Sequence, residues 1–184
     1  MKRFYAVLVN TLIANVTTSY LWFALTFWLY LETKSVLATA VVGGVYMLLV
    51  AFCGLLFGTF VDKNYKKKVM LLSSTISTVA YILAGIAYWI LGEERIADLG
   101  SPYLWIFAAI VLAGAVVENL RNIALSTTVT ILVPSKERDK ANGLIGSVSG
   151  VAFLVTSVLS GLSIGYLGLG WTLVVAISLT AKSK

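Results

Sequence analysis

Five long apolar stretches, separated by short polar connections, dominate this chain. A helix needs about 20 predominantly apolar residues to cross the hydrocarbon of a bilayer, and each stretch exceeds that length. Inside hydrocarbon every backbone N–H and C=O must be satisfied within the segment, so the stretches are predicted to be helices. The sequence therefore predicts an all-α integral membrane fold, with spans at residues 4–31, 36–61, 69–91, 102–133 and 141–167.

A sixth apolar run is shorter than the others. It covers residues 168–181 and is followed by Lys182 and Lys184. A helix of roughly 14 residues is only about 21 Å long, against ~30 Å of hydrocarbon. We therefore expect a truncated sixth helix, with the chain stopping inside its last span. Because the connections are short, successive helices should be antiparallel neighbours in a single membrane domain, residues 1–184.

Composition excludes several classes of protein. The chain is 59% hydrophobic and 12% charged, whereas soluble domains carry about a quarter charged residues. It has no histidine and a single cysteine, Cys53, so neither an intrachain disulfide nor a His/Cys metal site is expected. The sequence also lacks a nucleotide-binding glycine loop. We expect no cofactor, no metal and no enzymatic activity.

The distribution of basic residues predicts the orientation. The net charge of +6 does not indicate a nucleic-acid partner, because the basic residues flank apolar helices instead of lining one face. Short cytoplasmic loops are enriched in lysine and arginine, and one side has only Lys34 and Arg95. We expect a multi-pass protein of the cell membrane with a cytoplasmic N-terminus. The basic residues on the cytoplasmic side are Lys2, Arg3, Lys63, Lys66, Lys67, Lys68, Lys136, Arg138 and Lys140.

Aromatic residues gather at the opposite, outer ends of the helices. Tryptophan and tyrosine favour the headgroup level of a bilayer, so these residues are predicted to form an interfacial belt. They are Phe27, Trp28, Tyr30, Tyr88, Trp89, Tyr103 and Trp105.

Two charged residues, Glu118 and Arg121, lie near the middle of the fourth apolar stretch. Each such residue costs about 2.5–3.5 kcal/mol on insertion scales, so it should face the bundle interior or a water-filled cavity. Their spacing of three places both on one helical face, where they can pair. We interpret them as candidates for a substrate or proton pathway. A structural ion pair that fixes helix packing is the alternative.

The first apolar stretch has a polar face. Its members recur at steps of three and four, which is the spacing of one side of a helix. Such a face either lines a cavity or forms hydrogen bonds with neighbouring helices. If it lines a cavity, Trp22 can stack on a flat or cationic substrate. The face consists of Thr11, Asn15, Thr18, Trp22 and Thr26.

Hydroxyl residues are also frequent at positions 73–78 of the third stretch. Serine and threonine hydroxyls can bond back to the preceding turn of their own helix. We expect these hydroxyls to bond within their own helix and to have no role in the site.

The connection between the second and third stretches has a recognisable pattern. It reads Gly58-Thr59-Phe60-Val61-Asp62-Lys63-Asn64-Tyr65-Lys66-Lys67-Lys68. This resembles the signature of the major facilitator superfamily between its second and third helices, and it falls at the same place in the topology. The matching positions are Gly58, Asp62, Lys63, Lys67 and Lys68, while Tyr65 stands where the family usually has a second glycine. In the family this aspartate is thought to lock one arrangement of the two halves of the transporter.

A second resemblance lies between residues 132 and 171. Leu132-Val133-Pro134, Ala141-Asn142-Gly143, Gly161 and the segment Leu167-Gly168-Leu169-Gly170-Trp171 are similar to the efflux branch of the superfamily, which includes macrolide and siderophore exporters. The chain departs from that branch at two places. Thr156 and Ser157 stand where drug antiporters have a Gly-Pro pair, and Thr18 stands where an acidic residue is common.

The two resemblances imply the N-terminal six-helix half of a transporter. The implied function is secondary active transport, with efflux of hydrophobic or amphipathic small molecules and with proton coupling left open. The implied partners are the lipid bilayer, a small-molecule substrate, and a missing C-terminal half, a second subunit or a second copy of the chain. A non-transporting membrane scaffold or assembly protein is the alternative, in which the polar residues only hold helices together.

Overall fold

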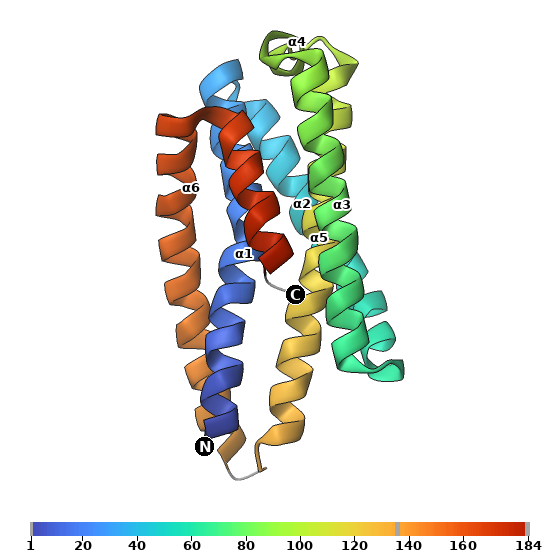
Figure 1. Cartoon of the computed structure of the whole chain (residues 1–184), viewed down its shortest axis with the longest axis vertical. Helices are drawn as coiled ribbons and strands as arrows, with labels where there is room; N and C mark the ends of the chain where they lie inside the picture. The colour runs from blue at the N-terminus through green and yellow to red at the C-terminus, as the bar shows by residue number, and fades with distance from the viewer. Residues whose placement is uncertain (1, 135–136, 183–184) are drawn as a thin grey trace.

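The computed structural model describes the backbone of residues 2–134 and 137–182; side chains are described except at 2–7, 10–11, 129–132 and 182. Within this part of the chain all regular structure is helical, which confirms the predicted fold class (Figure 1). Five of the helices are long and apolar enough to cross a membrane. The helices are α1 (Lys2–Thr33), α2 (Val36–Lys63), α3 (Lys66–Leu91), α4 (Glu93–Ala97), α5 (Pro102–Leu132) and α6 (Arg138–Lys182).

The first two connections between long helices are tight turns. Ser35 caps the start of α2, since its Oγ accepts a hydrogen bond from the amide of Ala38 at 3.1 Å. At the other end of α2 the side chain of Lys66 donates to the carbonyl of Val61 at 2.8 Å. Both contacts satisfy backbone groups that a helix end leaves without an intrahelical partner. The helices they join run antiparallel as a result.

The fifth and sixth apolar runs form one helix, α6, which has a break at Gly168 and no loop between the two runs. Gly168 interrupts α6 with φ 72° and ψ 177°, a conformation that suits glycine because it has no Cβ. We call residues 138–167 the first arm of α6 and residues 169–182 the second arm. Figure 1 shows the second arm, in red, folded back beside the rest of the bundle. Leu169 and Leu173 then enter the core.

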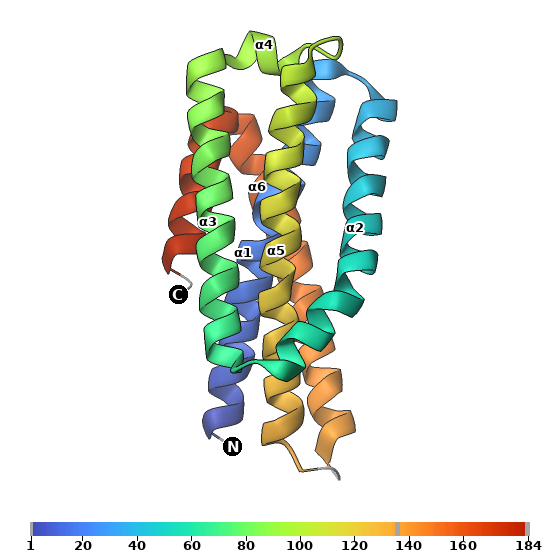
Figure 2. The same cartoon turned by 90° about the vertical axis from the view of Figure 1, so that its right-hand side faces the viewer.

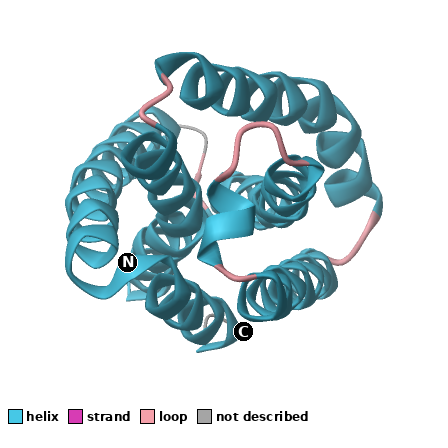
Figure 3. Cartoon of the chain, turned by 90° about the horizontal axis from the view of Figure 1, so that it is seen from above, coloured by secondary structure: helices cyan, strands magenta, loops and turns pink. Residues whose placement is uncertain are grey.

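A short helix between α3 and α5 was not predicted. α4 crosses one end of the bundle, which is the end facing the viewer in Figure 3. Its Ile96 is fully buried, and Glu93 accepts a hydrogen bond from the indole Nε1–H of Trp28 at 3.0 Å. Trp28 is only 1% exposed, so the predicted interfacial role is wrong for this residue. Trp89 and Trp105 remain exposed, as an interfacial belt requires.

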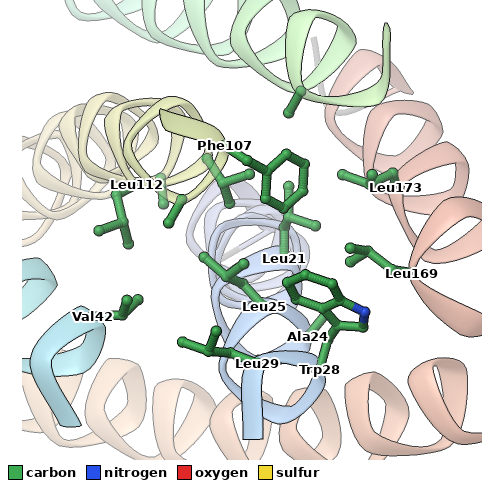
Figure 4. Close-up of a cluster of buried hydrophobic side chains, with 14 of the residues drawn as sticks. Leu21, Ala24, Leu25, Trp28, Leu29, Val42, Phe107, Leu112, Leu169 and Leu173 are labelled. Carbon is green, nitrogen blue, oxygen red and sulfur yellow. The ribbon is translucent and has the colours of Figure 1, made fainter. Parts of the chain in front are cut away.

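The largest core cluster forms where α1, α5 and the second arm of α6 meet. In Figure 4 the labelled leucines of α1 lie between Leu112 of α5 on one side and Leu169 and Leu173 of the second arm of α6 on the other. The rings of Trp28 and Phe107 pack edge to face, with centroids 6.0 Å apart. Lipid tails are as apolar as these side chains, so close packing, not exclusion of water, holds the helices together.

α2 is the most peripheral of the long helices. It approaches α5 and α1 at a few positions, including Val42 and Tyr46, and most of its other side chains are exposed. Leu55, for example, is 81% exposed. An apolar groove of ≈ 280 Å³ separates part of α2 from α5, and Figure 2 shows α2 standing away from the bundle there. In a bilayer this outer face is suited to lipid.

The contact between α3 and α5 is close. The hydroxyl of Ser73 donates to the carbonyl of Val117 at 2.7 Å, and that of Ser77 donates to the carbonyl of Gly114 at 2.8 Å. The expectation that these hydroxyls bond only within α3 is therefore wrong for both serines. Small side chains bring the two backbones near enough for hydroxyls to reach across, as membrane helix interfaces commonly do.

Gly114→Ala should destabilise the protein. A Cβ at this position would lie 2.5 Å from Cε1 of Tyr81 and 3.1 Å from Cβ of Ala80, and such overpacking costs about 1–3 kcal/mol. Unfolding midpoints in mixed micelles of SDS and a mild detergent measure the change. Gly146→Ala is the matched control, because nothing lies within 4 Å of the added Cβ. Equal stability of both variants would contradict the close contact.

Candidate functional site

The site is centred on Glu118, which lies midway along α5 and is fully buried. Its Oε2 accepts a hydrogen bond from the hydroxyl of Tyr81, on α3, at 2.9 Å. Tyr81 is also fully buried. No described residue donates a hydrogen bond to the second carboxylate oxygen, Oε1. A buried polar atom without a partner is costly, so this oxygen is available for a proton, a water molecule or a ligand.

Arg121 lies one helical turn beyond Glu118 and is 1% exposed. The predicted pairing of its guanidinium with the Glu118 carboxylate stays a prediction, although both side chains are buried. Two opposite charges brought together in a medium of low dielectric offset part of each other's desolvation cost. The interior placement of both side chains matches the rule that intramembrane charges face the bundle and not the lipid.

Two aromatic residues extend the site toward α1 and α2. Trp22 stacks on Tyr46 with ring centroids 4.5 Å apart and an interplanar angle of 24°. The missing side chain of Gly43 makes room, because a Cβ there would lie 3.3 Å from the Trp22 ring. Tyr46 is 8% exposed and belongs to the same buried core cluster as Tyr81. We call Trp22, Tyr46, Tyr81, Glu118 and Arg121 the polar cluster.

The predicted polar face of α1 is divided between two roles. Asn15 donates to Ser149 on the first arm of α6 at 2.8 Å, so it takes part in helix packing. Thr18 is buried and donates to the carbonyl of Ala14 within α1 at 2.8 Å. Among the predicted members whose side chains the structure describes, Trp22 is the one that belongs to the polar cluster. The side chain of Thr11 lies outside the described residues.

The signature residues lie in and before the turn that joins α2 to α3. Gly58 has open space around its Cα, with nothing within 4 Å of an added Cβ. Asp62, Lys63, Lys67 and Lys68 are exposed. Asp62 has no hydrogen bond or ion pair through its carboxylate within the part of the chain that the structure describes. Its predicted role against a second half of the transporter stays a prediction.

Two members of the polar cluster, Tyr46 and Tyr81, were not found from the sequence. Both occur in apolar stretches where a tyrosine is equally suited to lipid or to core. The signal that was available is helical spacing: Ser74, Ser77, Thr78 and Tyr81 share one side of α3, and that side is buried. In the described residues no group of three or more His, Cys, Asp or Glu side chains could hold a metal.

The fold and the cluster together define a multi-pass helical membrane protein with ionisable groups in its interior. A family model, the Major Facilitator Superfamily, matches residues 7–181. The chain therefore belongs to the major facilitator superfamily, whose members are membrane transporters. No curated protein and no solved structure matches the chain.

Removing the Tyr81 hydroxyl should destabilise the protein. Tyr81→Phe leaves the buried carboxylate of Glu118 without its one described donor, and an unsatisfied buried group costs about 1–3 kcal/mol. Unfolding midpoints in mixed micelles measure the loss. Tyr65→Phe removes an equivalent hydroxyl from a side chain that is 78% exposed, and a surface change of this kind stays within about 0.5 kcal/mol. A loss at Tyr65 as large as at Tyr81 would contradict this account.

Proposed function

We propose that this membrane transporter is a secondary active exporter of hydrophobic or amphipathic small molecules, with Glu118 as its proton-carrying residue. The observation that carries the proposal is a fully buried carboxylate with one oxygen bound to Tyr81 and the other without a described donor. Ionisable residues at membrane depth mark substrate or proton pathways, because their insertion cost is retained only where function needs them.

The coupling step uses the two charge states of Glu118. When ionised, the carboxylate is attracted to Arg121 and accepts the hydrogen bond from Tyr81. When protonated, it loses most of the attraction to Arg121 and gains a donor of its own on the free oxygen. The two states therefore differ in the charge and in the hydrogen-bonding groups that α5 presents to Tyr81 of α3. Such a difference in contacts is what couples a proton to a conformational change.

The aromatic pair supports the proposed substrate class. Trp22 is half-buried and stacks its ring on Tyr46. Aromatic faces bind flat apolar groups and cations, and the surrounding side chains are mostly apolar. An amphipathic molecule can place its cationic or flat group on the aromatic faces and its apolar part against the apolar side chains. The similarity of residues 132–171 to macrolide and siderophore exporters favours the outward direction.

A second helical half would complete the site. Asn15, Trp22 and Thr26 are partly exposed along one side of α1, between α2 and the first arm of α6. Transporters of this kind hold substrate near the bilayer midplane between two such halves and rock about it. We propose that this side of α1 meets a second half, supplied by the same polypeptide, by a second subunit or by a second copy of the chain.

A scaffold or assembly role is the second candidate, and the contacts of α1 favour it in part. Asn15 and Tyr20 both hydrogen-bond to serines of the first arm of α6, at 2.8 and 2.6 Å, and such bonds serve packing alone. Family membership favours transport. A test of Glu118 distinguishes the two candidate functions, because a scaffold role does not require this carboxyl group to gain and lose a proton.

Glu118→Gln should abolish or uncouple export while leaving the protein in the membrane. The amide keeps the shape and the acceptor for Tyr81 but cannot ionise. The measurement is efflux of amphipathic dyes from cells that express the gene encoding this chain, at matched protein levels. Glu94→Gln, at an exposed position of α4, is the control. Unchanged efflux by the Glu118 variant would remove this residue from the mechanism.

We also propose that the N-terminus and the α2–α3 turn face the cytoplasm of the cell that carries the protein in its plasma membrane. The excess of lysine and arginine on that side supports this orientation. In a Cys53→Ser background, Tyr65→Cys should react with a membrane-impermeant maleimide only after the cells are opened. Leu99→Cys, exposed near α4, should react in intact cells. The reverse pattern would overturn the orientation.

A further inference from the structure

The turn between α2 and α3 concentrates positive charge at one end of the bundle. Lys63 ends α2, and three further lysines begin α3. We call Lys63, Lys66, Lys67 and Lys68, together with Tyr65 between them, the lysine patch. Figures 1 and 2 show this turn set back from the ends of α1, α5 and α6 on the same side. A turn set back in this way lies nearer to the level of the lipid headgroups than the helix ends around it.

The lysines of the patch differ in their contacts. Lys66 donates to the carbonyls of Val61 and Asp62, at 2.8 and 3.3 Å, and so closes the end of α2. Lys68 lies over the Tyr65 ring, 5.5 Å from its centroid. Lys63 and Lys67 are exposed, and the described part of the chain gives their ammonium groups no hydrogen-bond or ion-pair partner. These two lysines are the ones available to another molecule.

The local electrostatics favour an anion as that molecule. The first turn of α3 contains three lysines and no acidic residue, although the start of a helix carries a partial positive charge. The charges of the patch therefore repel the helix end as well as one another. Asp62 is the one acidic side chain of the turn, and its exposed carboxylate forms no ion pair with a described residue. A bound phosphate would offset this repulsion.

We propose that the lysine patch binds the phosphate of an anionic phospholipid. Charge complementarity selects the headgroup, since basic clusters next to a membrane helix bind anionic lipids. The exposed ring of Tyr65 supports a position of the patch at the membrane–water interface, because tyrosine favours the headgroup level. The lipid then holds the α2–α3 turn at the membrane surface. This inference does not depend on which solute the protein transports.

Native mass spectrometry of the full chain, purified with equal amounts of phosphatidylglycerol and phosphatidylcholine, tests the proposal. The wild type should retain phosphatidylglycerol in preference. The double variant Lys63→Gln, Lys67→Gln should lower that preference by about 30-fold, because each lysine near the surface contributes about a factor of five. The variant Lys34→Gln, Arg95→Gln removes the same charge from the opposite end and should keep the preference.

Two results of the lipid comparison would overturn the proposal. One is equal retention of both lipids by the wild type. The other is an equal loss of preference in both double variants, which would indicate a general effect of net charge. Inorganic phosphate added to the wild type should leave the lipid bound, whereas displacement by phosphate would assign the patch to a soluble anion. Because the readout is lipid retention, its failure is independent of any failure to transport.

Discussion

The hydrogen bond between Tyr81 and Glu118 is the interaction on which the interior of this protein depends. Hydrocarbon offers no water to a buried carboxylate, so a partner must come from another helix. α3 supplies that partner, and it does so because Ser73, Ser77 and Gly114 let α3 and α5 approach closely. The close approach, the buried charge and the position of Arg121 are thus parts of one arrangement. A change that separated α3 from α5 would leave the buried Glu118 carboxylate without its described hydrogen-bond donor in an apolar environment.

Around this arrangement the bundle divides into a well-packed part and an open part. α1, α3, α5 and the second arm of α6 bury most of their inner faces, while α2 keeps much of its surface exposed. The polar cluster lies between these two parts of the bundle, because Tyr46 of the exposed helix α2 stacks on Trp22 of the packed helix α1. Movement of α2 relative to α1 would therefore change the stacking of Trp22 on Tyr46. A packed scaffold with one loosely held helix is a reasonable design for a protein that changes shape around a bound solute.

The fold class followed from the sequence because lipid leaves few choices to a long apolar segment. The length of each run, the short connections and the positions of the charges were enough to predict an all-helical bundle. The sequence ended the fifth run at residue 167, but the left-handed backbone of Gly168 and the helix α4 were not predicted, because they depend on backbone geometry and on contacts with distant helices. Glu118 and Arg121 stood out as charges in an apolar run. Tyr46 and Tyr81 did not, since a tyrosine in an apolar run gives no sign of which neighbour its hydroxyl will meet. Trp28 shows the same limit: its indole N–H donates to Glu93, a residue that the sequence places in a connection.

The reversal at Gly168 has a consequence for how the membrane topology of this protein is determined. The two arms of α6 are joined by one glycine, so no hydrophilic segment between them extends into the aqueous phase. A protease, a glycosylation tag or an inserted epitope has no place to act there without breaking the hairpin. Experiments that count accessible loops will therefore register the two arms of α6 as one continuous segment.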